Sequence, residues 1–126
     1  MKKILIVEDD PMLLEIYQKK FLDYKYDILT ASTGIEALQK IRIEKPELVL
    51  LDLVLPEEDG FEVLKKIKQS PRTKDIKVII FSNLSQVENK QKATELSADG
   101  FITKSDYTPR EIIEEVGKVL LNKAKK

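Results

Sequence analysis

The sequence predicts an α/β protein built around a five-stranded parallel sheet, and two regularities support this prediction. Short apolar runs recur along the chain, and three of them are aliphatic or β-branched throughout, which is typical of strands covered on both faces. Between the runs lie amphipathic stretches with apolar residues at helical spacing. Because strand and helix alternate regularly, we expect right-handed crossovers, with helices on both faces of a doubly wound sheet.

The predicted strands are residues 4–7, 28–31, 48–51, 78–81 and 101–103. Four of the five helices have a clear apolar face: Leu14, Tyr17 and Phe21; Ile35, Leu38 and Ile41; Phe61, Leu64 and Ile67; Ile112, Val116 and Val119. The fourth helix, residues 85–96, has few apolar side chains, so burial stabilises it less than the others. It is either a solvated surface helix or a mobile regulatory one.

Capping boxes mark the predicted helix starts, where a Ser, Thr or Asp side chain bonds a first-turn N–H and a Glu three residues later bonds back. The candidate pairs are Thr33 with Glu36, Asp59 with Glu62, Ser85 with Glu88, and Thr108 with Glu111. Pro109 follows Thr108 at the first helical position, where proline is favoured. No linker, repeat or low-complexity segment interrupts the pattern, so residues 1–126 are predicted to form a single domain.

Composition excludes several function classes. The 126 residues are 42% hydrophobic and 35% charged, and 22 basic residues balance 22 acidic ones. Basic residues alternate with Glu and cluster only at Lys123, Lys125 and Lys126, so no nucleic-acid partner is expected. Because Cys and His are absent, any metal must be held by oxygen ligands. The first apolar run is too short for a signal peptide or a membrane span, so we expect a cytoplasmic protein without a membrane partner.

Polar side chains follow four of the five predicted strands, at ends that meet along one edge of a parallel sheet. They are Glu8, Asp9 and Asp10 after the first strand, Asp52 after the third, Ser82 at the fourth and Lys104 after the fifth. Asp9 or Asp10 could simply cap the next helix. Ser82 could start a turn, and Lys104 could protect an edge strand. Asp52 is harder to explain in this way, because a carboxylate directly after four aliphatic residues is poorly solvated and needs a charged partner.

The chemistry of this edge favours magnesium and phosphate. If Glu8, Asp9 and Asp52 converge, their charges repel, and the pKa of one carboxyl rises unless a cation intervenes. Mg²⁺ suits such a site because it binds one or two carboxylates, keeps several waters and adds phosphate oxygens. Phosphoryl transfer needs mainly alignment and charge neutralisation, which Mg²⁺ and the Lys104 ammonium could supply. Asp52 would then be the nucleophile, ionised without a general base.

With these residues identified, the sequence resembles the receiver domains of response regulators over essentially its whole length. The matching motifs are residues 7–11 (Val-Glu-Asp-Asp-Pro), 50–53 (Leu-Leu-Asp-Leu), 55–56 (Leu-Pro) and 59–61 (Asp-Gly-Phe), followed by Ser82, Phe101 and Lys104. The resemblance implies a flavodoxin-like (βα)5 fold with strand order 2-1-3-4-5. It also implies a signalling switch of a two-component phosphorelay rather than a turnover enzyme.

The resemblance further assigns the metal site and the phosphoacceptor. Asp52 accepts a phosphoryl group from the phosphohistidine of a sensor histidine kinase or a phosphotransfer protein, with Lys104 beside it. Mg²⁺ is held directly by Asp9 and Asp52, through water by Glu8, and by the backbone carbonyl of Val54. These assignments come from the family motifs and stand here as expectations.

The resemblance also predicts how phosphorylation is transmitted. Ser82 is expected to bond the phosphoryl group and Phe101 to swing inward, which changes the face formed by the fourth helix, fifth strand and fifth helix. For Phe101, ordinary packing within its strand is the alternative. The expected partner is a downstream protein, and the chain is expected to be a monomer or a weak dimer on phosphorylation.

Two residues depart from the family pattern. Ser105 follows Lys104 where proline is usual, often in a cis bond; a cis bond to serine costs about 2.5–4 kcal/mol, so we expect a trans or a strained turn. Asn83 follows Ser82 where a small residue is common. Its side chain could narrow access to Asp52 and alter the lifetime of the acyl phosphate.

Competing functions fit the residues less well. A nucleotide or flavin binder would need a Gly-rich loop where Glu8, Asp9 and Asp10 stand. An aspartyl phosphatase would carry a second Asp two residues after its nucleophile, at the position of Val54. The remaining alternative is a phosphorylation-independent binding module that keeps the receiver fold. We expect no DNA-binding or catalytic output domain after the fifth helix, unless the sequence is part of a longer protein.

Overall fold

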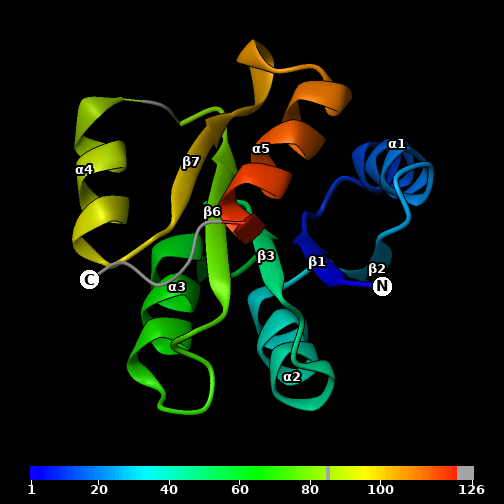
Figure 1. Ribbon diagram of the computed structural model, residues 1–126. Coiled ribbons are helices and arrows are strands. Elements are labelled where there is room, and N and C mark those ends of the chain that lie inside the picture. Colours follow the sequence, from blue (N-terminus) through cyan, green and yellow to red (C-terminus); the bar gives the residue numbers. More distant parts are fainter. Residues whose placement is uncertain (85, 122–126) are drawn as a thin grey trace.

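Five parallel strands form the central sheet, in the order β2-β1-β3-β6-β7 (Figure 1). The computed structural model describes residues 1–84 and 86–121. The strands of this sheet are β1 Lys3–Val7, β2 Asp27–Ala31, β3 Leu48–Leu51, β6 Lys77–Ser82 and β7 Gly100–Thr103. Each neighbouring pair is parallel. Since β6 and β7 are the fourth and fifth strands of the sheet along the chain, the flavodoxin-like order 2-1-3-4-5 is confirmed.

Helices cover both faces of the sheet, as predicted. They are α1 Pro11–Leu22, α2 Gly34–Glu44, α3 Gly60–Gln69, α4 Val87–Glu95 and α5 Pro109–Leu121. The α1 and α5 helices pack on one face, and α2, α3 and α4 pack on the other (Figure 1). Within the described part of the chain, no helix has the length and apolar character needed to cross a membrane.

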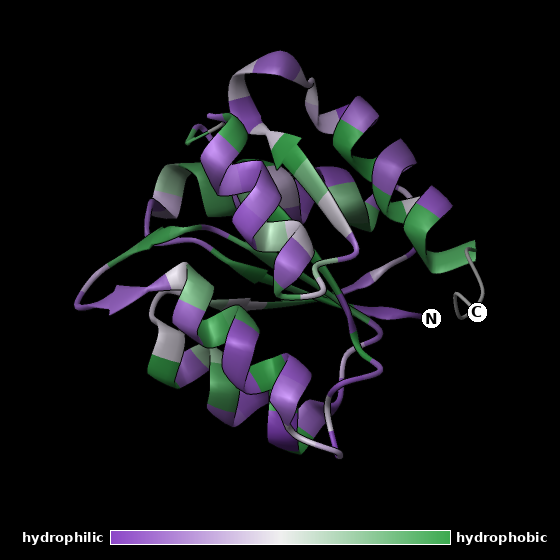
Figure 2. Ribbon diagram, turned by 90° about the vertical axis from the view of Figure 1, so that its left-hand side faces the viewer, coloured by the Kyte–Doolittle hydropathy of each residue, from purple (hydrophilic) through white to green (hydrophobic). Residues whose placement is uncertain are grey.

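Strand side chains alternate between these two helical layers. In β1, Ile4 and Ile6 pack with α1 and α5, whereas Leu5 and Val7 pack with α2, α3 and α4. All four are fully buried, and each such side chain contributes about 1.5–3 kcal/mol relative to exposure. In Figure 2 the largely hydrophobic strands lie between helices that alternate between hydrophobic and hydrophilic residues. The buried strands therefore hold in place the polar residues that follow their carboxyl ends.

The capping box predicted at α5 is complete. The Thr108 hydroxyl accepts a hydrogen bond from the Glu111 N–H at 3.2 Å, and the Thr108 N–H donates to the Glu111 carboxylate at 2.8 Å. Pro109 is the first residue of α5. This helix therefore begins where the sequence predicted.

The other capping boxes are only partly formed. Thr33 caps α2 by accepting from the Glu36 N–H at 3.1 Å, but the Glu36 carboxylate accepts from the Ser32 N–H. Asp59 caps α3 through the Phe61 N–H at 2.9 Å. The Ser85 candidate lies outside the described residues, as do Lys123, Lys125 and Lys126. The described N-cap of α4 is Gln86, which makes no side-chain capping bond.

The structure corrects one predicted helical face and adds elements that the sequence did not predict. Ile35 is 68% exposed, and α2 instead buries Gly34, Ala37 and Ile41. Ile35 follows Gly34 by one residue and so points about 100° away around the helix. The additional elements are the antiparallel pair β4 Val54–Leu55 and β5 Glu58–Asp59, and the 3-10 helix η1 Lys104–Asp106. Such short elements carry too little periodicity to predict.

Gly60 allows α3 to begin directly against the chain that follows β3. A Cβ atom at this position would lie 2.4 Å from the Asp52 carbonyl oxygen and 2.5 Å from the Leu53 Cα atom. The Gly60 N–H donates to the Leu53 carbonyl at 3.0 Å. Because both neighbours of the missing Cβ are backbone atoms, only glycine fits without a shift of the chain.

We therefore expect Gly60→Ala to lower the free energy of unfolding by roughly 1–3 kcal/mol, because backbone atoms must move to admit a methyl group. The matched control is Gly117→Ala in α5, where the nearest atom to a Cβ is the Tyr26 hydroxyl at 3.9 Å. That variant should be more stable by roughly 0.5–1 kcal/mol, because alanine is favoured over glycine in a helix. Urea denaturation of both variants tests the close approach, and equal effects of the two substitutions would contradict it.

The α4 helix is the most weakly packed of the five. Its buried residue is Ala93, whereas Val87 is 75% exposed. The helix ends in a Schellman motif: Ser97 N–H donates to the Thr94 carbonyl and Ala98 N–H to the Ala93 carbonyl, both at 2.9 Å. Ser97 has a φ of 71°, a conformation that favours glycine.

Replacing Ser97 by glycine should stabilise this helix end. We expect Ser97→Gly to raise the free energy of unfolding by about 0.5–1 kcal/mol, since the left-handed conformation costs a residue with a Cβ atom more than it costs glycine. Gln91→Gly, on the exposed side of α4, should instead lower it by about 1 kcal/mol. Urea denaturation measures both changes in the free energy of unfolding. If both substitutions change it in the same direction, the left-handed conformation of Ser97 does not limit the stability of α4.

Candidate functional site

The strand ends bring the predicted polar residues together at one edge of the sheet. Glu8 follows β1, Asp52 follows β3, Ser82 ends β6, and Lys104 follows β7. Glu8, Asp52 and Ser82 are buried, and the Lys104 side chain is 13% exposed. Polar groups so poorly solvated need partners: Glu8, Asp52 and Lys104 find them in one another, and Ser82 finds one in a backbone N–H of its own loop. The prediction that four strands supply this edge is confirmed.

Three carboxylates form an acidic cluster at this edge. Oxygen atoms of Glu8, Asp9 and Asp52 all lie within 4.8 Å of one another. Asp10, in contrast, is the N-cap of α1, and its carboxylate accepts from the Met12 N–H at 2.9 Å. Of the two aspartates that could cap this helix, Asp10 does so and Asp9 remains in the cluster.

Lys104 turns inward and bridges two members of the cluster. Its ammonium lies 2.9 Å from Asp52 Oδ2 and also bonds Glu8 Oε1. The ring of the buried Phe81 lies beneath it, with Nζ 5.1 Å from the ring centroid. Although β7 is an edge strand, Lys104 is therefore not a charge exposed to protect that edge, and this alternative is wrong.

The charges of the cluster are incompletely balanced. Burial raises the pKa of Glu8, and Lys104 opposes part of that rise. Burial works to lower the pKa of Lys104, but the bonds to Glu8 and Asp52 outweigh it and raise this pKa. Lys104 is therefore an ammonium at neutral pH, and with all three carboxylates ionised two negative charges remain. Carboxylate oxygens with that surplus suit a divalent, oxygen-preferring cation such as Mg²⁺.

The carboxylate of Asp52 is held in one orientation. Its Oδ1 accepts from the Val54 N–H at 3.1 Å, and its Oδ2 accepts from Lys104. The backbone N–H of Asp52 donates to the Val7 carbonyl at 3.1 Å, which extends the pairing of β1 with β3. Asp52 therefore lies between the acidic cluster and the lysine with little freedom to turn.

Ser82 and the two residues that depart from the family pattern, Asn83 and Ser105, lie at the carboxyl ends of β6 and β7. The Ser82 hydroxyl accepts from the Leu84 N–H at 3.1 Å, which is the turn role considered from the sequence. The Lys104–Ser105 bond is trans. The Ser105 N–H donates to Asn83 Oδ1 at 2.8 Å. The two departures thus contact each other directly, and the Asn83 amide is turned toward Ser105.

Phe101 lies on β7 beside α4 and is partly buried against the α2–α3–α4 side of the core. The Lys90 ammonium is 5.8 Å from the centroid of its ring. A cleft of about 210 Å³ lies between α4 and β7; its lining is Lys90, Ala93, Thr94, Ala98, Asp99, Gly100 and Phe101. The aromatic ring therefore borders open space, and its role as a switch remains a prediction.

Sequence reasoning missed several residues that shape the site. The sequence identifies Gly60 only as part of a motif and Phe81 only as part of a strand, yet Gly60 packs against the backbone of Asp52 and the Phe81 ring lies beneath Lys104. The Asn83–Ser105 bond was also missed, although the sequence held a signal. Both residues directly follow site residues at the ends of strands that are neighbours in the predicted order.

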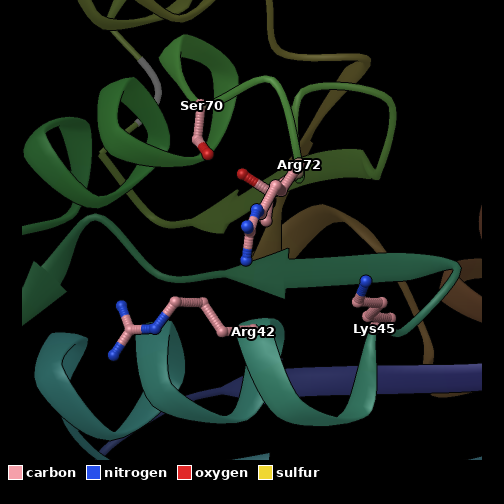
Figure 3. A pocket seen from close by; sticks show the side chains of 5 residues that line it. Arg42, Lys45, Ser70 and Arg72 are labelled. Carbon is pink, nitrogen blue, oxygen red and sulfur yellow. The ribbon is translucent and has the colours of Figure 1, made fainter.

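A separate pocket of about 80 Å³ lies at the opposite edge of the sheet (Figure 3). Its lining residues are Arg42, Lys45, Ser70, Arg72 and Thr73. The α2 and α3 helices both end beside this pocket, so it lies at the opposite ends of the strands from the acidic cluster. The carboxyl edge of the sheet remains the candidate functional site.

Comparison with known proteins agrees with this site. The family described as "Response regulator receiver domain" matches residues 4–117. The alkaline phosphatase synthesis transcriptional regulatory protein PhoP of Bacillus subtilis (strain 168) is 36% identical over 119 residues, which are 94% of this chain and 48% of PhoP. The chain thus spans about half the length of this relative.

Two solved structures share the fold along nearly the whole chain. The Mn²⁺-bound form of response regulator Rcp1 has a TM-score of 0.83 at 26% identity, covering 99% of this chain and 98% of Rcp1. The phosphorylated cyanobacterial phytochrome response regulator RcpA has a TM-score of 0.85 at 30% identity, covering 98% and 96%. Together with the match to residues 4–117, these findings show that the chain belongs to the response regulator receiver domains of two-component systems.

Proposed function

We propose that this receiver domain is switched by transfer of a phosphoryl group from a phosphohistidine to Asp52, with Mg²⁺ bound. The supporting observation is the position of Asp52, which shares the acidic cluster with Glu8 and Asp9 and also contacts Lys104 at 2.9 Å. A phosphoryl group on this carboxylate would lie next to the cluster and next to the ammonium. The ammonium, together with the Mg²⁺ that the cluster would hold, would then balance the negative charge that the transfer develops.

The transfer needs little covalent assistance from the protein. A carboxylate oxygen of Asp52 forms the new bond to phosphorus as the phosphorus–nitrogen bond of the phosphohistidine breaks, and the imidazole leaves with the electron pair. Lys104 neutralises charge on the phosphoryl oxygens, and Val54 N–H holds Asp52 in place. The product is an acyl phosphate, which water later hydrolyses. The protein is therefore a phosphoacceptor rather than a turnover enzyme.

The proposed ligands of Mg²⁺ are Asp9 and Asp52 directly, Glu8 through water, and the carbonyl of Val54. When bound, the ion would neutralise the cluster and align the phosphoryl oxygens. The oxygen-only donor set supports this proposal, as does the Mn²⁺ named for the similar Rcp1.

We further propose that the signal leaves through the face of α4, β7 and α5. Weak packing of α4 supports this proposal, since a helix that buries little is displaced at low cost. Ser82 would bond the phosphoryl group, and Phe101 would turn inward. The proposed partners are a sensor histidine kinase or phosphotransfer protein and a downstream protein target. Residues 1–126 would act as a single cytoplasmic domain, monomeric or weakly dimeric on phosphorylation, with neither nucleic acid nor membrane as partner.

A phosphorylation-independent binding module is the alternative. Asn83 and Ser105 favour it, because they depart from the family pattern next to two site residues. Glu8, Asp9, Asp52 and Lys104 favour phosphorylation, because they keep the contacts that the chemistry requires. The two functions differ in whether Asp52 can be modified.

Phosphoryl uptake from acetyl phosphate tests the proposal. With Mg²⁺ we expect a mass gain of one phosphoryl group, and loss of that gain in Asp52→Asn or in excess EDTA, because nucleophile and metal are both required. Asp10→Asn is the matched control, since asparagine also caps helices and Asp10 faces α1. Intact-mass spectrometry measures the uptake. Uptake in Asp52→Asn would refute the assigned acceptor, and no uptake by the unsubstituted chain would favour the binding module.

The carboxylate cluster gives a second prediction, which concerns thermal stability. Ligand binding to the folded state alone adds about 2.7 kcal/mol when the ligand is at a hundred times its Kd, so Mg²⁺ should raise Tm. Asp9→Asn should raise Tm in EDTA, because it relieves repulsion, and should remove most of the Mg²⁺ effect.

Differential scanning calorimetry with and without Mg²⁺ measures these shifts. Asp75→Asn is the control, because this exposed aspartate precedes β6 at the opposite edge of the sheet. It should keep the full Mg²⁺ shift. A shift that is the same in Asp9→Asn and in the control would place the metal elsewhere.

A further inference from the structure

The backbone N–H of Ser105 needs a partner that the family's usual residue would not need. It lies in the first turn of η1, where N–H groups lack partners within the helix. Asn83 Oδ1 accepts this hydrogen bond at 2.8 Å. Proline at position 105 would have no N–H to donate, and a small residue at position 83 would have no side-chain amide to accept. The bond therefore requires a residue other than proline at position 105 and a side-chain acceptor at position 83, and this chain has both.

This bond joins the two loops that carry Ser82 and Lys104. Asn83 directly follows Ser82, and Ser105 directly follows Lys104. The β6 and β7 strands are parallel neighbours whose last paired residues are Ser82 and Thr103. The bond thus lies just beyond the end of the strand pairing, at the edge where both loops leave the sheet (Figure 1). One of its two ends is anchored, since Lys104 is held by Asp52 and Glu8.

We infer that the Asn83–Ser105 hydrogen bond is a positioning contact that restrains the β6–α4 loop in the unphosphorylated arrangement. Ser82 accepts from Leu84 N–H in this arrangement. Bonding of Ser82 to a phosphoryl group on Asp52 would draw the start of the loop toward Asp52 and away from Ser105. This inference rests on the proposed function, because it assigns the bond an effect on phosphorylation of Asp52.

The expected size of the effect follows from the nature of the bond. A contact made in one state shifts a two-state equilibrium only by its differential free energy. An exposed hydrogen bond has a small net value, so its loss should increase the phosphorylation-competent population by about 2- to 5-fold.

Two substitutions remove the bond from opposite sides. Asn83→Leu keeps similar volume without the acceptor, and Ser105→Pro removes the donor. Each should raise the initial rate of phosphorylation by acetyl phosphate about 2- to 5-fold, and the double variant should gain no more than either alone. Ser105→Ala keeps the N–H and should match the unsubstituted chain. In a Ser82→Ala background, Asn83→Leu should have no effect, because the restraint acts through Ser82.

Amide exchange of Ser105, followed by NMR without phosphorylation, provides an independent readout. The Ser105 amide should exchange faster in Asn83→Leu than in the unsubstituted chain. Unchanged exchange, or an unchanged or slower rate of phosphorylation in both bond-breaking variants, would overturn the inference and leave the proposed function standing. No phosphoryl uptake by the unsubstituted chain would overturn the proposed function and this inference with it.

Discussion

The ion pairs of Lys104 with Glu8 and Asp52 are the interaction on which the rest of the site depends. They connect the ends of β1, β3 and β7, which are far apart in the sequence. Burying charged groups costs several kcal/mol per ion before their attraction is counted, so such an arrangement is weak evidence for stability. The stability comes instead from the strands, where residues such as Leu5 and Leu50 are fully buried. The apolar sheet thus supports a cluster that would be unfavourable by itself.

The amino ends and the carboxyl ends of the sheet strands are held together by different contacts. At the edge opposite the site, Lys68 bonds Asp99 at 2.9 Å and the Ile76 carbonyl at 2.8 Å, while Asp99 accepts from Val78 N–H at 2.8 Å. These bonds fix the starts of β6 and β7 relative to α3. At the site edge the same strands end in loops that, among residues 1–84 and 86–121, are joined by the Asn83–Ser105 bond.

Much of the fold and of the site could be predicted from the sequence because both depend on repeated local signals. Buried strands such as β3 are continuous apolar runs, and Asp52 follows that run directly. Lys104 directly follows the shorter fifth strand, which contains Phe101 and Ile102. Ile35 was placed on the wrong face because its helix contains apolar residues on two sides. The small β4–β5 pair depends on tertiary contacts, for which a single sequence gives no periodic signal. The bond between residues 83 and 105 has no periodic signal either, and is indicated only by the position of both residues directly after site residues on neighbouring strands.

The contact between Asn83 and Ser105 also bears on whether this receiver has lost its function. Independent drift at two positions would be expected to leave an unmatched donor or a side chain without a partner. Here the N–H that comes with serine is matched by the amide that comes with asparagine. The neighbouring Ser82 and Lys104 keep their places at the site edge, and Lys104 keeps both carboxylate partners. Under the proposed function, the two departures are better explained as a compensated pair that adjusts the switch than as the first losses of an abandoned one.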